Sequence, residues 1–234
     1  MRNAYIKSTG SFAPERVVPN KYFNDLLGED VDAWLVENLN IRERRWCSEN
    51  ESTSFLCIEA ANRALTNANM NAEEIDLIII STDTPEYISP STASVVQFKL
   101  GAKNAGTFDI NTACAGFVTA LDVASKYIRS DERYKNILVI GAYAMSKYLD
   151  MTDKKTVTLF ADGAGAVILA ATDNVDRGFL ASELYTEGQY HDWMGIYAGG
   201  THRPITHDVV SNKDHLLKFV KKFPKEINAL TWTR

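Results

Sequence analysis

The sequence has few cysteines, no long apolar run and no excess of positive charge. Its three cysteines, Cys47, Cys57 and Cys114, are an odd number without metal-ligand spacing, which argues against a disulfide framework or a metal centre. The longest purely aliphatic run, residues 77–80, is too short to cross a bilayer. The formal net charge of -5 argues against a nucleic-acid binder that works through bulk charge. These absences predict a cytoplasmic protein that binds neither nucleic acid nor membrane.

The composition is that of a folded globular protein. Of 234 residues, 45% are hydrophobic and 24% are charged, which is enough for one good-sized core or two small ones. Any acidic partner must be met by a local basic patch, because the chain as a whole is acidic.

Strand-like and helix-like segments alternate along the chain. Apolar periodicity and capping residues predict strands at 4–8, 75–81, 106–110 and 136–141, and helices at 21–27, 31–39, 52–68, 91–100 and 113–129. Ser52 or Thr53 is the predicted cap of the third helix. This alternation implies a largely parallel sheet with helices on both faces. The small residues at 161–166 allow a tight reversal, and 178–185 reads as a further strand.

Two basic segments each have two interpretations. The first contains Arg42, Arg44 and Arg45 beside Trp46. It forms either a solvated turn or a contact for a phosphate group. Residues 214–223 are expected to form a short amphipathic helix, with Lys218, Lys222 and Lys225 on one face of this segment. Those lysines form either a solvated face or a docking patch for an acidic protein.

The stretch TFDINTACAGFVTAL at 107–121 places Cys114 between a predicted strand and a predicted helix. Phe117, Leu121, Ala124 and Ile128 recur at helical spacing, so the helix can bury one face. The unpaired N–H groups at a helix N-terminus favour a thiolate and can also receive an oxyanion. Cys114 is therefore the candidate nucleophile.

Four segments together, FDINTACAGF, TPEYISPSTA, NILVIGA and LFADGAGAVIL, resemble the thiolase superfamily, and within it β-ketoacyl-acyl-carrier-protein synthase III and its acyltransferase relatives. The resemblance implies a layered α/β/α/β/α thiolase-like fold and a homodimer. It implies that residues 1–171 form the N-terminal half and that residues 172–234 begin the C-terminal half. A chain lacking part of that second half is expected.

The resemblance also implies an enzyme. Cys114 would take an acyl group from acyl-CoA or acyl-carrier protein, with its backbone N–H forming half of an oxyanion hole. In the complete family, condensation with malonyl-carrier protein then gives a β-ketoacyl thioester for fatty-acid or secondary metabolism. Coenzyme A enters only as part of the substrate, and no cofactor is expected.

Further site residues come from the same resemblance. Trp34 matches the tryptophan at the coenzyme A entrance, Asn38 replaces an arginine there, and Lys154 replaces a second arginine. Ser89 replaces a bulky residue that a partner subunit contributes to the acyl pocket, which predicts room for a longer or more polar acyl group. The family docks its carrier protein near the helix expected to hold Lys218, Lys222 and Lys225.

A histidine and an asparagine that the family uses in condensation have no counterpart in this sequence. None of His191, His202, His207 and His215 lies in a matching motif, and each is expected to be a surface or loop residue. Two alternatives to condensation therefore stay open. One is an acyltransferase that passes the acyl group to an alcohol or amine, and the other is a noncatalytic subunit that shapes a partner's active site.

Overall fold

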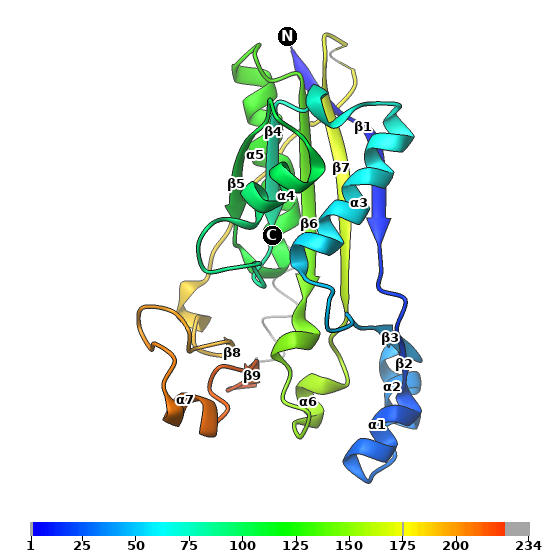
Figure 1. The fold of residues 1–234 in the computed structure, drawn as a ribbon, viewed down its shortest axis with the longest axis vertical. Coiled ribbons are helices and arrows are strands. Elements are labelled where there is room, and N and C mark those ends of the chain that lie inside the picture. The colour runs from blue at the N-terminus through cyan, green and yellow to red at the C-terminus, as the bar shows by residue number, and fades with distance from the viewer. Residues whose placement is uncertain (1, 175, 223–234) are drawn as a thin grey trace. The chain divides into compact units, whose positions relative to one another are not determined.

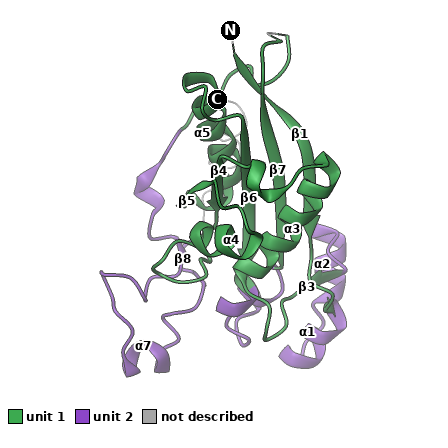
Figure 2. Cartoon of the chain, turned by 45° about the horizontal axis from the view of Figure 1, so that its top comes forward, with its two compact units in different colours: residues 1–18, 43–145, 161–184 green, residues 19–42, 146–160, 185–234 purple. Residues whose placement is uncertain are grey.

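The structure is a computed structural model that describes residues 2–174 and 176–222 (Figure 1). The chain divides into two compact units (Figure 2). The first lies within residues 1–18, 43–145 and 161–184, and the second within 19–42, 146–160 and 185–234. This division interleaves the two units along the sequence. The predicted halves at 1–171 and 172–234 are defined by the family resemblance and not by contacts within the chain, so they stay a prediction.

A five-stranded sheet forms the centre of the first unit, in the order β1-β7-β6-β4-β5. The strands are β1 (Asn3–Phe12), β4 (Leu77–Ser81), β5 (Gly106–Ile110), β6 (Asn136–Ala144) and β7 (Asp162–Thr172). β4 runs parallel to β5 and β6, whereas β7 runs antiparallel to β6 and to β1. The predicted largely parallel sheet is therefore mixed, because the chain returns through residues 145–161 and places β7 antiparallel beside β6 instead of crossing over to a parallel position.

Helices cover both faces of this sheet, as predicted. α3 (Thr53–Ala68) and α4 (Thr92–Leu100) form one core with Ile78 and Ile80 of β4. α5 (Gly116–Ser130) forms the other with Leu77 and Ile79 of the same strand (Figure 1). Successive β4 side chains point to opposite faces and all are buried, which explains why this strand reads as a continuous apolar run.

The approach of β1 to α3 is close enough to require glycine at position 10. A Cβ atom on Gly10 would lie 2.3 Å from the carbonyl oxygen of Ala60 and 2.4 Å from the nitrogen of Ala64. The neighbouring Ser8 hydroxyl donates a 2.8 Å hydrogen bond to the Ala64 carbonyl. Backbone of the strand therefore packs directly on backbone of the helix.

The N-termini of α3 and α4 are capped by carboxylates from elsewhere in the unit. Asp109 of β5 accepts hydrogen bonds from the Thr92 and Ala93 N–H groups, at 2.6 and 2.8 Å. Glu86 accepts the Ser54 N–H at 2.8 Å. Ser52, one of the two predicted caps of α3, makes no side-chain cap and donates its hydroxyl to Glu86 instead, because the Glu86 carboxylate already accepts the Ser54 N–H.

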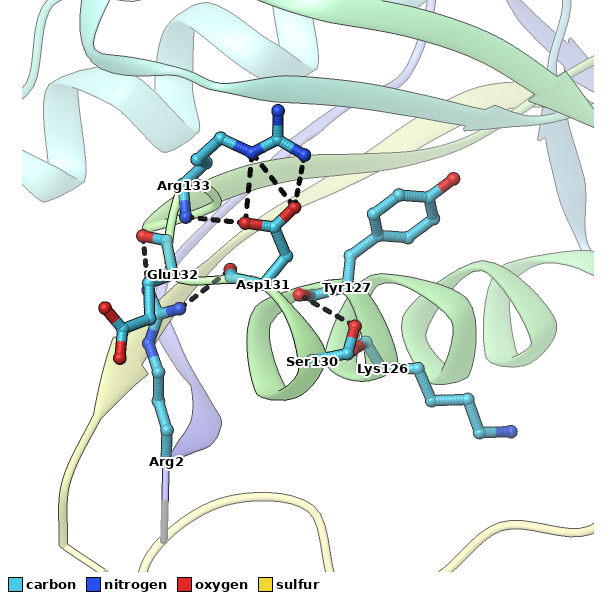
Figure 3. Close-up of polar contacts among 7 residues, drawn as sticks. All are labelled: Arg2, Lys126, Tyr127, Ser130, Asp131, Glu132 and Arg133. Carbon is cyan, nitrogen blue, oxygen red and sulfur yellow. Dashed lines mark hydrogen bonds and ion pairs between the residues drawn. The ribbon is translucent and has the colours of Figure 1, made fainter.

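The C-terminal end of α5 is tied to the start of β1 (Figure 3). The Arg2 guanidinium donates to the carbonyl oxygens of Asp131 and Tyr134, at 2.8 and 2.7 Å. The Asp131 carboxylate accepts a hydrogen bond from the Arg133 guanidinium at 2.6 Å. A cation at the C-cap carbonyl complements the helix dipole, so this end of α5 is held against the start of β1.

Three predicted features of this unit differ in the structure. Residues 161–166 do not reverse the chain but lie largely within the continuous strand β7. Residues 178–185 form no strand in the described structure, and the Ser182 hydroxyl there bonds to Asp122. The basic segment is not a solvated turn: it contains β3 (Glu43–Arg45), which pairs with β2 (Val17–Pro19), and buried Arg44 donates to the Val18 carbonyl at 3.1 Å.

The second unit is built from short elements. They are α1 (Asn20–Leu27), α2 (Asp32–Leu39), α6 (Lys154–Val157), β8 (Met194–Gly195), α7 (His207–Ser211) and β9 (Lys218–Phe219). Single 3₁₀ turns in the chain lie at Ala72–Glu74, Ala113–Ala115, Met145–Tyr148 and Gly188–Tyr190. Within the described ranges, no helix is long and apolar enough to span a membrane.

The helix predicted at 214–223 is wrong for the part that the structure describes. β9 pairs antiparallel with β8, the Leu217 N–H donates to the Tyr148 carbonyl and the Val220 N–H to the Trp193 carbonyl, each at 2.8 Å. These donors are satisfied by distant carbonyls, so they are not available for helical bonds to residues four positions earlier. Tertiary pairing thus overrides the amphipathic pattern.

Candidate active site

Cys114 lies in the 3₁₀ turn Ala113–Ala115, directly between β5 and α5. The α-helix begins at Gly116, three residues later than the sequence predicts. Ala113 has a φ of 45°, which is unfavourable for a residue with a Cβ atom, and its N–H donates to the Asn111 side chain at 3.1 Å. A strained turn therefore presents the thiol at the junction of strand and helix.

Hydroxyl groups and close packing fix this turn. The Thr112 hydroxyl donates to that of Thr119 at 3.1 Å, and Thr119 donates to the Ala115 carbonyl at 3.0 Å. A Cβ atom on Gly116 would lie only 1.9 Å from the Ser81 hydroxyl oxygen. The start of α5 thus touches the end of β4, and no larger residue fits at position 116 without movement.

The three cysteines have different environments. Cys114 is exposed, whereas Cys47 and Cys57 are buried. Burial raises the pKa of the Cys57 thiol, and the charges of Asp109 and Glu86 raise it further. Since the thiolate is the reactive form, the accessible Cys114 is the residue suited to nucleophilic chemistry.

Two polar residues not singled out from the sequence lie at the same edge of the sheet. Asp83 follows the end of β4, and Tyr143 lies near the end of β6. The Ala144 N–H donates to the Thr84 hydroxyl at 2.9 Å, which holds the residues next to Asp83 and Tyr143 against each other. Across the sheet, Ala144 also pairs with Asp162 of β7.

Burial favours the neutral forms of the Asp83 carboxyl and the Tyr143 hydroxyl, and nearby negative charge also favours the neutral form of Tyr143. Burial raises the pKa of the half-buried Asp83 carboxyl. Burial also raises the pKa of the Tyr143 hydroxyl, and negative charge on Asp83, Cys114 and Asp162 raises it further. Tyr143 therefore stays a hydrogen-bond donor at neutral pH in the electrostatic neighbourhood of Cys114.

The sequence did contain a signal for both residues. The carboxyl ends of neighbouring parallel strands meet at one edge of a sheet, and in open α/β sheets ligands bind there. Asp83 lies two residues after a predicted strand, as the segment with Cys114 follows another. The position of Tyr143 was harder to foresee, because β6 continues to Ala144, beyond the predicted end at 141.

Ser89 lies in the connection between β4 and α4, in the first unit with Cys114. It is exposed, and so are its neighbours Tyr87 and Ile88, the latter at 87%. Asp109, five residues before Cys114, caps the helix that this connection enters. The structure therefore links the Ser89 segment to the strand that leads to Cys114.

Trp34, Asn38 and Lys154 belong to the second unit. Trp34 is 56% exposed on α2, and the Asn38 side chain donates to its carbonyl oxygen at 2.9 Å. Lys154 is the first residue of α6, and its ammonium group lies 3.0 Å from both carboxylate oxygens of Glu29. The predicted phosphate-binding lysine thus already has an anionic partner.

The predicted docking lysines have unequal positions. Lys218 is half-buried on β9 and forms an ion pair with Asp214. Lys222 is exposed, and Lys225 lies outside the described residues. Lys221, which the sequence did not single out, pairs with Asp192 at 2.7 Å and lies 5.8 Å from the centre of the Trp193 ring. The lysines hence do not share one helical face.

The histidines and acidic residues form no metal site in residues 2–174 and 176–222. His191, His202 and His207 are exposed, as expected of surface or loop residues, and His215 is half-buried. A cavity of about 400 Å³ in the second unit is lined by Asp150, Asp153, Lys213, Lys218 and the apolar residues Leu216, Leu217, Phe219 and Val220.

Known proteins with similar sequences share one description. Residues 108–188 match the family model for 3-oxoacyl-[acyl-carrier-protein] synthase III. A β-ketoacyl-[acyl-carrier-protein] synthase III from Ehrlichia canis is 40% identical over 212 residues, covering 91% of this chain and 66% of the relative.

Solved structures that resemble this chain carry the same enzyme name. The 3-oxoacyl-[acyl-carrier-protein] synthase III of Aquifex aeolicus is 39% identical, with a TM-score of 0.77 over 82% of this chain and 61% of that one. The enzyme of the same name from Pseudomonas aeruginosa is 28% identical, with a TM-score of 0.82 over 93% of this chain and 65% of that one. The fold is therefore the predicted thiolase-like α/β fold.

The chain spans 58–66% of the length of the curated relatives compared with it. The region matched by the family model contains the end of β5, the turn with Cys114, α5, β6 and β7. The family model thus includes the segment with Cys114, and the chain belongs to the β-ketoacyl-acyl-carrier-protein synthase III family.

Proposed function

We propose that Cys114 accepts an acyl group from a thioester, either acyl-CoA or acyl-carrier protein, as the first step of β-ketoacyl synthesis. The observation that carries this proposal is the exposed thiol on a strained turn at the start of α5. The thiolate attacks the thioester carbonyl, the oxygen becomes an oxyanion, and collapse expels the donor thiolate. The Cys114 N–H would supply half of the oxyanion hole.

In the whole protein, the acyl-cysteine would then react with the carbanion that malonyl-carrier protein forms on losing carbon dioxide. The product is a β-ketoacyl thioester for fatty-acid or related secondary metabolism. We expect the neutral Tyr143 hydroxyl to donate a hydrogen bond to a polar atom of the substrate bound near Cys114. Coenzyme A is a substrate here, and the proposal requires no resident cofactor.

A homodimer is part of this proposal. β5 is the edge strand of the sheet beside β4, and within residues 2–174 and 176–222 no strand pairs with its other edge. Exposed apolar side chains occur on segments around this strand, with Ile88 at 87%, Phe98 at 83% and Val118 at 65%. Pairing with a second copy along β5 would cover the edge of this strand and the exposed apolar side chains. It would also bring Ser89 of the partner subunit to the acyl pocket, as the family resemblance implies.

We place the carrier-protein dock on the basic segment of the second unit. Lys222 is exposed, and the ion pair of Lys221 with Asp192 is itself about half exposed, so an acidic partner can reach both lysines. Lys218 and Lys225 complete the set predicted from the sequence. A reduced, cytoplasmic location fits the exposed free thiol of Cys114, since such a thiol survives where reductants are present.

The direct test is acylation of the purified chain. After incubation with several acyl-CoAs and acyl-carrier proteins, intact-mass measurement should show one added acyl group, and peptide mapping should place it on Cys114. Cys114→Ala should remove the adduct. Cys47→Ala is the matched control and should retain it, because Cys47 is buried. Absence of an adduct with every donor would favour a noncatalytic subunit.

A further inference from the structure

The strands β4 and β6 extend past the N-terminus of α5, which directly follows the turn with Cys114. At the end of β4, the Ser81 hydroxyl lies where a Cβ atom on Gly116 would be. In β6, a Cβ atom on Gly141 would lie 3.1 Å from the Phe117 ring. Ser81 and Gly141 are partners in the parallel pairing of the two strands. Both contacts are with the first two residues of α5, so the next side chains on this face lie beyond the helix.

Those next side chains are Asp83 and Tyr143. Side chains two positions apart share a face of a strand, and two positions advance the chain by about 6.6 Å. Tyr143 is still within β6. The Thr82 and Thr84 hydroxyls lie 3.2 Å apart on one side of the backbone, so Asp83 between them projects to the other side. The register of the two strands therefore sets Asp83 beside Tyr143, in front of the turn with Cys114.

The electrostatics agree with this placement. Burial raises the pKa of the Tyr143 hydroxyl, and the charges of Asp83 and Cys114 raise it further, so both charges lie within reach of the Tyr143 ring. Burial also raises the pKa of the Asp83 carboxyl. Both side chains stay half-buried, so part of each can meet a group attached to Cys114. Asp83, Tyr143 and Cys114 thus form one polar cluster within the first unit.

A carboxyl group beside a nucleophile discriminates among acyl groups. An ionised carboxylate only accepts hydrogen bonds, whereas a hydroxyl group can donate one. Hydrogen bonds to an ionised acceptor are stronger than those between neutral groups. An acyl chain that places a methyl group at Asp83 leaves this bond unmade, and one that places a carboxylate there meets a like charge.

We infer that Asp83 is a specificity-determining residue that accepts a hydrogen bond from a hydroxyl group on the acyl chain carried by Cys114. This inference rests on the proposed function. The transfer step itself is unchanged: the bond from Cys114 Sγ to the acyl carbon forms, the donor thiolate leaves, and the hydroxyl proton stays on the acyl group. The inference goes beyond the polar acyl group predicted from Ser89, because it names the polar group and the residue that binds it.

The experiment uses four-carbon acyl groups that differ in one substituent: butyryl, 3-hydroxybutyryl, 4-hydroxybutyryl and succinyl. Each is supplied as the CoA ester and as the carrier-protein ester, and the rate of Cys114 acylation is followed by intact mass. In the unchanged chain, the better hydroxybutyryl donor should react about tenfold faster than butyryl, and succinyl should react most slowly.

Two variants separate the charge of Asp83 from its oxygen acceptor. Asp83→Ala removes both, so the ratio of the hydroxybutyryl rate to the butyryl rate should fall to about one. Asp83→Asn keeps a neutral oxygen acceptor, so this ratio should fall to about threefold. The ratio of the succinyl rate to the butyryl rate should rise in both variants. Each ratio is taken within one variant, so it does not depend on the fraction of the chain that folds.

Asp76→Asn is the matched control. Asp76 is also half-buried, but it lies at the opposite end of β4, where it accepts the Lys135 and Asn136 N–H groups at 2.7 and 2.8 Å. This variant should leave both ratios unchanged. Equal rates for butyryl and hydroxybutyryl in the unchanged chain, or a hydroxyl preference that both Asp83 variants retain, would overturn the inference. Failure of every donor to acylate Cys114 would instead refute the proposed function.

Discussion

Replacing Gly116 with alanine tests whether the contact between α5 and β4 positions Cys114. The new Cβ atom would lie 1.9 Å from the Ser81 hydroxyl oxygen and 3.2 Å from its Cβ atom. Both residues are buried, so neither can move into solvent. Overpacking of this kind costs about 1–3 kcal/mol, offset by at most about 1 kcal/mol from the better helix propensity of alanine. We expect a net loss of about 1–2 kcal/mol.

The loss of stability in Gly116→Ala should depend on the Ser81 hydroxyl. In a Ser81→Ala background the hydroxyl oxygen is absent, and the nearest remaining atom is the Cβ atom of residue 81, at 3.2 Å. The cost of Gly116→Ala measured by urea unfolding should then fall below about 1 kcal/mol, which defines a double-mutant cycle. The rate of Cys114 acylation should fall in Gly116→Ala, because the clash displaces the start of α5, and should recover in the double variant.

Gly106→Ala provides the control for the loss of a glycine. Its Cβ atom would lie 3.5 Å from the Leu77 side chain, an ordinary contact, so stability should change by no more than about 0.5 kcal/mol. The reasoning is refuted if Gly116→Ala is as stable and as reactive as the unchanged chain. It is also refuted if the loss is the same with and without the Ser81 hydroxyl.

Two further predictions concern the ends of helices. Asp109→Ala removes the acceptor of the Thr92 and Ala93 N–H groups and should destabilise the chain by about 1–2 kcal/mol in urea unfolding; an unchanged midpoint would show that α4 needs no such cap. The Arg133 guanidinium lowers the pKa of the Asp131 carboxyl to about 2. This lowered pKa stabilises the fold above the unfolded value of about 4, and the contribution is lost as the pH falls towards 2. Arg133→Gln should bring the pKa of Asp131, measured by NMR titration, back towards about 4, and a value that stays near 2 would contradict the assignment.

Much of the local structure could be predicted from the residues because its causes are local. α4 follows Ser91, whose hydroxyl accepts the Ser94 N–H, and ends at Gly101 in the left-handed conformation. β5 has the predicted bounds Gly106–Ile110. The position of Cys114 between a strand and a helix also follows from the pattern around it, since capping, turn chemistry and apolar spacing act within a few residues.

Other features depend on residues far apart in the sequence. The amphipathic pattern at 214–223 favoured a helix, but pairing of β9 with β8 uses its backbone donors instead. The pattern of the sheet did not reveal that β7 runs antiparallel, because its small residues are compatible with either a turn or a tightly packed strand. The cap of α3 also depends on a distant residue, because Glu86, and not the predicted Ser52, accepts the Ser54 N–H at the start of this helix.

The sequence by itself determined the position of Cys114 between its strand and its helix, because capping and apolar spacing act between neighbouring residues. Only the tertiary structure brought Tyr143 and Asp83 to the same edge of the sheet, through the bond from Ala144 to Thr84. It alone also paired Glu29 with Lys154, which are 125 positions apart. Periodicity and capping report short-range preferences, whereas the charge and hydrogen bonds around a site depend on which distant side chains the fold brings together.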